Sequence, residues 1–201
     1  MYAHSCLCNG VITVALAHAI LVALLDCPSS GYDLAKRFDG SVGFFWAASH
    51  QQIYRELAKL ETNGIIISET IEQETRPNKK LYAITDPGKA TLTEWMRTPS
   101  DLSPLKDDLL VKIFGGYVVE PTVILQELRQ HRKQHQTRLV EYQAIEDRFF
   151  PDAEALSTKS VYQYLTLRNG IQYEQGWLKW CDEALSTLQS LIAETSTTSA
   201  E

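Results

Sequence analysis

The polar face of one predicted helix carries the residues with the clearest chemistry in the chain. Within residues 48–64, Ile53, Leu57 and Leu60 recur at the spacing of one helical face, so that face must pack against a core. The opposite face carries Gln51, Arg55, Ala58 and Thr62, flanked by Gln52, Tyr54 and Lys59. Arg and Gln can read base edges in the DNA major groove, and a small residue allows close approach. These residues predict a DNA recognition helix. The alternative is an ordinary amphipathic helix whose polar face meets water.

Both ends of this helix are encoded in the sequence. Ser49 can cap the first turn by accepting a backbone N–H. Gly64, after Asn63, supplies the left-handed conformation that commonly ends a helix. We therefore expect Ser49 to begin the helix and residues 49–60 to enter the major groove.

A pair of predicted strands follows the helix directly. Residues 65–71 are rich in β-branched side chains, residues 79–85 form a second strand, and the polar segment between them contains turn residues. Arg76, Lys79 and Lys80 place three positive charges at this tip. We expect residues 72–80 to form a wing that contacts the DNA backbone. One of the two lysines is expected to face the sheet, because adjacent strand residues point to opposite sides.

Two further helices precede the recognition helix. Residues 11–25 are apolar almost all round, which predicts a central buried helix, and a second helix is capped by Ser29 or Ser30 and runs to about residue 38. Three helices followed by a two-stranded wing make a winged helix-turn-helix. The aromatic segment 43–46 between them is interpreted as core filling, with stacking on nucleobases as the alternative.

The second half of the chain has a different composition. Residues 99–104 read as a linker, and helices are predicted over 105–118, 121–150 and 157–194, with a disordered tail over 195–201. Apolar residues form a spaced stripe along the last helix, which we expect to lack a sufficient partner within one subunit and to pair with a second copy. The predicted dimerisation residues are Val161, Leu165, Ile171, Trp177, Leu178, Leu185 and Leu188. Trp177 and Trp180 have a second interpretation as the walls of an effector pocket.

Composition excludes several other classes of protein. The 201 residues carry a net charge of −6, so DNA binding would need a local basic patch. The four cysteines are scattered and fit a reduced cytosolic compartment, and the apolar segment 11–25 is too short to span a membrane. His131 and His135 have the spacing of helical zinc ligands, but charged neighbours favour a solvated face. We expect no catalytic residues, no metal and no cofactor.

At this point the sequence resembles a known family. The run Ser29-x-Gly31-Tyr32-Asp33-Leu34-Ala35, the segments around Ser49 and Glu61, and the wing Arg76-Pro77-Asn78-Lys79-Lys80 resemble PadR-type transcriptional regulators. Residues 164–171 and the segment Trp177-Leu178-x-Trp180-Cys181 resemble the helical domain of the longer PadR subgroup, which is related to virulence-gene activators. The resemblance implies a homodimeric DNA-binding regulator whose long C-terminal helices pair.

These observations predict a mainly α protein with a small two-stranded β-wing. Its parts are a winged helix-turn-helix DNA-binding domain over residues 1–98 and a C-terminal helical dimerisation domain over 99–201. The predicted function is a transcriptional regulator, a repressor by preference, that binds a pseudo-palindromic operator in double-stranded DNA. A small-molecule effector is a further candidate partner, and the expected location is the bacterial cytoplasm, at the nucleoid. The alternatives are a winged-helix module that binds protein instead of DNA, and an enzyme for which no residue set can be named.

Overall fold

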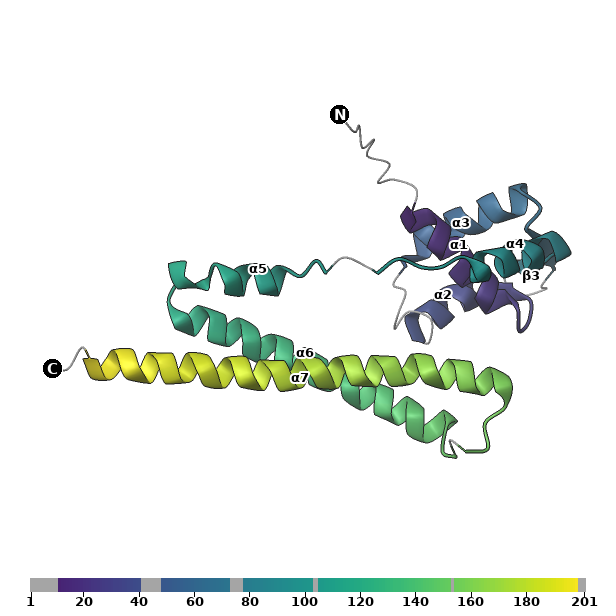
Figure 1. Ribbon diagram of the computed structural model, residues 1–201. Coiled ribbons are helices and arrows are strands. Elements are labelled where there is room, and N and C mark those ends of the chain that lie inside the picture. Colours follow the sequence, from purple (N-terminus) through teal and green to yellow (C-terminus); the bar gives the residue numbers. More distant parts are fainter. Residues whose placement is uncertain (1–10, 41–47, 73–77, 103–104, 153, 199–201) are drawn as a thin grey trace. The chain divides into compact units, whose positions relative to one another are not determined.

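The computed structural model describes residues 11–40, 48–72, 78–102, 105–152 and 154–198 (Figure 1). The chain divides into two compact units, Met1–Leu102 and Ser103–Glu201. The predicted fold class is confirmed, since both units are mainly helical and a small antiparallel sheet lies in the first. The predictions made for residues 1–10, the aromatic segment 43–46 and Arg76 lie outside the described residues. Within the described ranges, no helix combines the length and hydropathy needed to cross a membrane.

The first unit has the predicted order of helices and strands. It consists of α1 (Val11–Leu24), α2 (Gly31–Gly40), α3 (His50–Thr62), β2 (Ile66–Ile71), β3 (Lys79–Ile84) and α4 (Asp86–Arg97). The helices pack around one core, whose largest fully buried side chains are Ile20, Leu21, Leu34, Ile53, Leu57 and Ile66. Burying these apolar side chains is what holds the four helices and the sheet together.

The sheet has a third strand that the sequence did not predict. Strand β1 (Ser29–Ser30) pairs antiparallel with β3, with Ser29 opposite Tyr82 and Ser30 opposite Leu81, so the order is β1-β3-β2. Two residues are too few to show a period of two, and both serines were interpreted only as helix caps. Ser30 is both a strand residue and a helix cap, because its Oγ accepts the Asp33 N–H at 3.1 Å at the start of α2.

Helix α4 is capped by the residue that follows the second wing strand. The N-cap is Thr85: its Oγ1 accepts the Gly88 N–H at 3.1 Å and lies 2.8 Å from the carbonyl oxygens of Gly64 and Ile65. A hydroxyl can accept from the helix and donate to the preceding turn at once, whereas a carboxylate can only accept. Thr85 therefore joins α4 to the turn that ends α3.

The second unit contains two long helices and a shorter pair of helical segments. These are α5 (Asp108–Phe114), the 3-10 turn η2 (Gly116–Val118), α6 (Pro121–Phe149) and α7 (Thr158–Thr198). The helix predicted over 105–118, with its end at Gly115-Gly116 or shortly after, begins later than predicted. Asp107 caps α5 by accepting the Leu109 N–H at 2.8 Å, and Gly115 ends it. Helix α7 also continues to Thr198, so the tail predicted to be disordered is helical over 195–198.

Helices α6 and α7 pack along each other within the chain (Figure 1). One cluster between them contains Leu139, Tyr142, Ile171 and Leu178, and a second joins Leu109, Ile124, Leu128 and Cys181. The expectation that the stripe on the last helix lacks a partner within the subunit is therefore wrong for Ile171 and Leu178. Both are buried against α6, at 1% and 9% exposure. Side-chain period alone does not tell which helix covers a stripe.

Candidate nucleic-acid interface

Helix α3 begins with a full capping box. Ser49 Oγ accepts the Gln52 N–H at 3.3 Å, and Gln52 Oε1 accepts the Ser49 N–H at 2.8 Å. Two backbone donors at the helix start are thereby satisfied. The Gln52 side chain, predicted as a DNA contact, thus also serves as part of the cap. The sequence analysis identified the Ser49 cap but not this second half of the box.

The two faces of α3 are divided as the helical period predicts. Ile53, Leu57 and Leu60 are buried in the core of the unit. The opposite face is exposed and carries Gln51, Tyr54, Arg55, Ala58, Lys59 and Thr62. Among the described residues, Arg55 has no carboxylate partner, whereas Lys59 Nζ lies 3.1 Å from the buried Glu56 carboxylate. Arg55 is therefore the cation on this face whose charge is available to a ligand.

Tyr54 is positioned by a glycine on the neighbouring helix. A Cβ built on Gly31 would lie 2.4 Å from the Tyr54 ring, so only glycine allows the ring to lie where it does. Tyr54 remains 48% exposed on the polar face of α3. This contact could not be predicted from a local pattern, because Gly31 and Tyr54 are distant in the chain.

The two described lysines of the wing are both ion-paired. Lys79 Nζ lies 2.8 Å from Asp33 Oδ2, at the start of α2, and Lys80 Nζ lies 2.8 Å from Glu61 Oε2, near the end of α3. Hydrogen bonding from each lysine lowers the pKa of its carboxyl partner, and bonding to Glu61 raises the pKa of Lys80. The sequence predicted lysines directed at DNA phosphates. The structure places Lys79 at the start of α2 and Lys80 near the end of α3, with a carboxylate bound to each.

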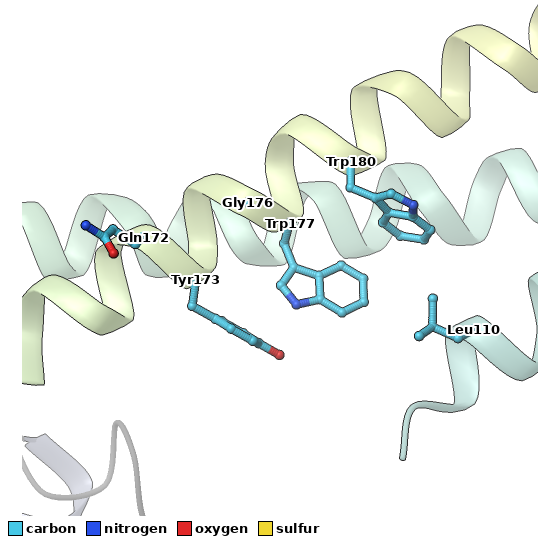
Figure 2. Close-up of a pocket in the computed structure, with 6 residues that line it drawn as sticks. All are labelled: Leu110, Gln172, Tyr173, Gly176, Trp177 and Trp180. Atoms are coloured by element: carbon cyan, nitrogen blue, oxygen red, sulfur yellow. The ribbon is translucent and has the colours of Figure 1, made fainter. Parts of the chain in front are cut away.

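A hollow of about 400 Å³ opens on the surface of the second unit (Figure 2). Half of its lining residues are aromatic, and the lining comes from α5 and α7: Leu110, Gln172, Tyr173, Gly176, Trp177 and Trp180. A Cβ on Gly176 would meet nothing within 4 Å, so the helix backbone is open at that point. The Trp177 and Trp180 rings meet edge to face, with centroids 5.1 Å apart.

A buried polar pair lies behind this hollow. His135 Nδ1 and Glu174 Oε2 are 2.5 Å apart, and the Trp177 ring stacks on the His135 ring at 4.8 Å. His131, the other half of the predicted zinc-like spacing, lies 3.8 Å from Glu127 instead. Among the side chains that the structure describes, no three metal-binding residues gather into a site. The two histidines therefore have separate partners.

Comparison with known proteins accounts for both units. The sequence model of the "Transcriptional regulator PadR-like family" matches residues 20–94, and that of "Virulence activator alpha C-term" matches residues 105–189. The "Probable transcriptional regulator Rv1176c" of Mycobacterium tuberculosis is 40% identical over 188 residues, covering 88% of this chain and 98% of that protein. The "Negative transcriptional regulator PadR" of Bacillus subtilis is 30% identical over 176 residues, covering 86% of this chain and 97% of that protein.

Solved structures show the same relationship. Bacillus subtilis PadR in complex with operator DNA matches with a TM-score of 0.77 and 27% identity, covering 87% of this chain and 99% of that one. The same protein has been solved with p-coumaric acid, with a TM-score of 0.72 and the same identity, covering 87% and 98%. The Vibrio cholerae virulence activator AphA matches with a TM-score of 0.73 and 31% identity, covering 88% and 99%. The winged first unit, the helical second unit and these relatives agree: the chain belongs to the PadR-like family of transcriptional regulators.

Proposed function

We propose that the protein is a homodimeric repressor that binds a pseudo-palindromic operator, with α3 in the major groove and the wing on the DNA backbone. The observation that carries this proposal is the exposed face of α3, which presents Arg55, Gln51 and the small Ala58, and on which Arg55 has no carboxylate partner within the described parts of the chain. Arg and Gln form bidentate hydrogen bonds with guanine and adenine in the major groove. The complex of the Bacillus subtilis relative with operator DNA supports the same use of the fold.

The rival function is a winged-helix module that binds another protein. Binding to DNA releases counterions, so its affinity falls steeply with salt, whereas a protein interface of ordinary polarity shows a much smaller slope. We propose no catalytic activity and no cofactor, consistent with a family of transcriptional regulators, and a location in the bacterial cytoplasm at the nucleoid.

The experiment selects operator sequences from a random duplex library with the intact protein and then measures their affinity by gel shift. Arg55→Ala should weaken binding to the selected sequence by about 1–3 kcal/mol, roughly 5- to 150-fold, if Arg55 contacts a base. Arg97→Ala is the matched control, because Arg97 is an exposed arginine on α4, paired with Glu94. Failure to enrich any sequence, or equal affinities for both variants, would contradict the proposal.

We propose that the second unit supplies the dimer interface. Of the predicted dimerisation residues, Val161 and Leu165 are 41% and 59% exposed on α7, and Trp177, Leu185 and Leu188 are half-buried. These side chains leave apolar surface that a two-fold copy of the same patch would cover. Ile171 and Leu178 contribute to this interface only indirectly, because they pack α7 on α6.

We propose a planar aromatic acid as the effector, held in the hollow between α5 and α7. The Bacillus subtilis relative has been solved with p-coumaric acid, and the aromatic rings around Gly176 offer flat apolar walls of suitable size. p-Coumaric acid should shift the thermal unfolding of the intact protein and lower its affinity for the selected operator. Trp180→Ala should reduce both effects, while Trp95→Ala, which changes an exposed tryptophan of the first unit, should not. Equal responses of the two variants would place the effector elsewhere.

A further inference from the structure

The wing lysines are neutralised by carboxylates that belong to other elements of the first unit. We infer that Asp33 and Glu61 attenuate DNA binding: in the free protein they hold Lys79 and Lys80, and DNA phosphates must compete with them for these lysines. This inference rests on the proposed DNA-binding function and adds a positioning role for two acidic residues.

In each lysine–carboxylate pair, the carboxylate is held in position by a second hydrogen bond. Asp33 Oδ2 also accepts the Ser30 hydroxyl at 2.8 Å, and Glu61 Oε1 accepts the hydroxyl of Ser68. Both carboxylates are therefore bound between two elements, α2 and β1 in one case and α3 and β2 in the other. A lysine side chain has four rotatable bonds and can leave such a partner without moving the backbone.

Both pairs lie where a phosphate can reach them. The lysine side chains are 39% and 45% exposed, and both project from β3, the strand beside the wing tip. Both carboxyl groups are charged at neutral pH even at their ordinary pKa, and hydrogen bonds from the lysines lower the pKa further, so the competition with phosphate persists under physiological conditions. Lys80 also lies 5.3 Å from the centre of the Tyr82 ring, a second contact that holds it in place.

Attenuation at the wing would favour specificity. Contacts between lysine and phosphate carry no sequence information and supply most of non-specific binding, whereas base contacts specify the site. Arg55 has no carboxylate partner among the described residues, so this arginine of the α3 face is not weakened in the same way, although Lys59 on that face is paired with Glu56. Neutralised wing lysines thus lower affinity for random DNA, and the operator is distinguished by the contacts of α3.

The test uses the intact protein and a fluorescent duplex of mixed sequence, about 30 bp long, enough for two major-groove sites one turn apart. Glu61→Gln and Asp33→Asn remove the charge and keep the shape of each side chain. Each should bind this DNA about three- to fivefold more tightly at about 50 mM salt, the magnitude of a surface ion pair. The salt slope should steepen by about 0.9 per released lysine, so the gain falls roughly 3.5-fold by about 200 mM salt.

Asp86→Asn is the matched control. Asp86 pairs with Lys89 on α4 at 3.0 Å, so this variant makes the same change in net charge away from the wing. It should leave both affinity and slope unchanged. If Asp86→Asn gains as much as the two wing variants, the effect is one of overall charge and the inference is overturned.

A double-mutant cycle tests whether Glu61 acts through Lys80. The gain of Glu61→Gln should disappear when Lys80→Gln is present, because no lysine remains to be released. A gain that persists in the double variant would show direct repulsion between the carboxylate and DNA, and would overturn the inference. Weaker binding of Glu61→Gln with an unchanged salt slope would show that the ion pair only stabilises the wing, and would also overturn the inference.

Two further outcomes distinguish this inference from the proposed function. If the wild-type protein selects an operator but the variants bind mixed-sequence DNA with wild-type affinity, the inference alone fails. If neither the wild-type protein nor any variant binds DNA, both proposals fail.

Discussion

Ser49 is the residue on which the start of the recognition helix depends. Ser49→Ala removes one half of the capping box and frees the Gln52 side chain from the other half. Loss of such a cap costs about 0.5–2 kcal/mol. We expect urea unfolding of the intact protein to show this loss in the transition of the first unit. Ser190→Ala, on an exposed turn of α7 where the hydroxyl bonds only to its own helix, should have no measurable effect; equal losses would mean that the cap is not needed.

Gly88 is required by a close approach between α4 and the turn after α3. A Cβ on Gly88 would lie 2.2 Å from the Ile65 carbonyl oxygen, which is backbone and cannot rotate away. We expect Gly88→Ala to destabilise the first unit by about 1–3 kcal/mol, as overpacking does. Gly31→Ala should cost less, since the half-exposed Tyr54 ring can move. Thermal unfolding ranks the two variants, and a larger loss for Gly31→Ala would contradict this account.

The residue scale also shows what the sequence could and could not predict about the candidate site. The exposure of Gln51 and Arg55 follows from helical period, and the structure agrees. The pairing of Lys79 with Asp33 and of Lys80 with Glu61 does not follow from any local pattern, because each pair joins elements far apart in the sequence. The contact of these lysines with DNA phosphates therefore remains a prediction, and the carboxylate partner of each is a finding of the structure.

The buried pair between α6 and α7 governs how these two helices fit. His135 and Glu174 are 8% and 2% exposed and lie between the two apolar clusters. Glu174→Ala would leave the His135 ring without its partner, at a cost of about 1–3 kcal/mol. Asp182→Ala, which removes an exposed partner of Arg132, is the control and should cost at most about 1 kcal/mol.

Chemical unfolding followed by tryptophan fluorescence measures this difference, because Trp177 stacks on His135 and reports on the same contact. Equal losses for the two variants would show that the buried pair contributes no more than a surface ion pair.

Elements bounded by prolines were predictable from the sequence. Pro121 begins α6 and Pro151 follows its end, so the sequence placed this helix within a residue of the observed Pro121–Phe149. The two-residue strand β1 was missed, because two residues are too few to show a period, whereas Gly115-Gly116 was identified as a candidate helix end. The position of β1 depends on tertiary pairing, and the start of α5 depends on the Asp107 cap.

At the scale of the whole molecule, the second unit exposes large apolar side chains on several elements. Those most exposed include Val111, Phe114, Tyr117, Val118, Tyr162 and Leu165. Monomeric proteins rarely leave such surface in contact with water. The sequence argument for a dimer assigned this surface to one stripe on the last helix. Since α6 covers Ile171 and Leu178, the proposed interface consists of exposed residues on α5, η2 and the start of α7, together with the half-buried Trp177, Leu185 and Leu188.

The proposed dimer is tested without deleting α7, whose removal would expose the core of α6. Changing both Val161 and Leu165 to Asp places two charges on exposed positions, so the unit should fold while the pairing of copies is lost. Light scattering should then report the monomer mass.

The affinity of this double variant for the selected operator should fall about 10²- to 10⁴-fold, because the two recognition helices no longer bind as one linked pair. Met96→Asp, on exposed α4 of the first unit, should remain dimeric. A dimeric double variant with full affinity would place the interface away from the start of α7.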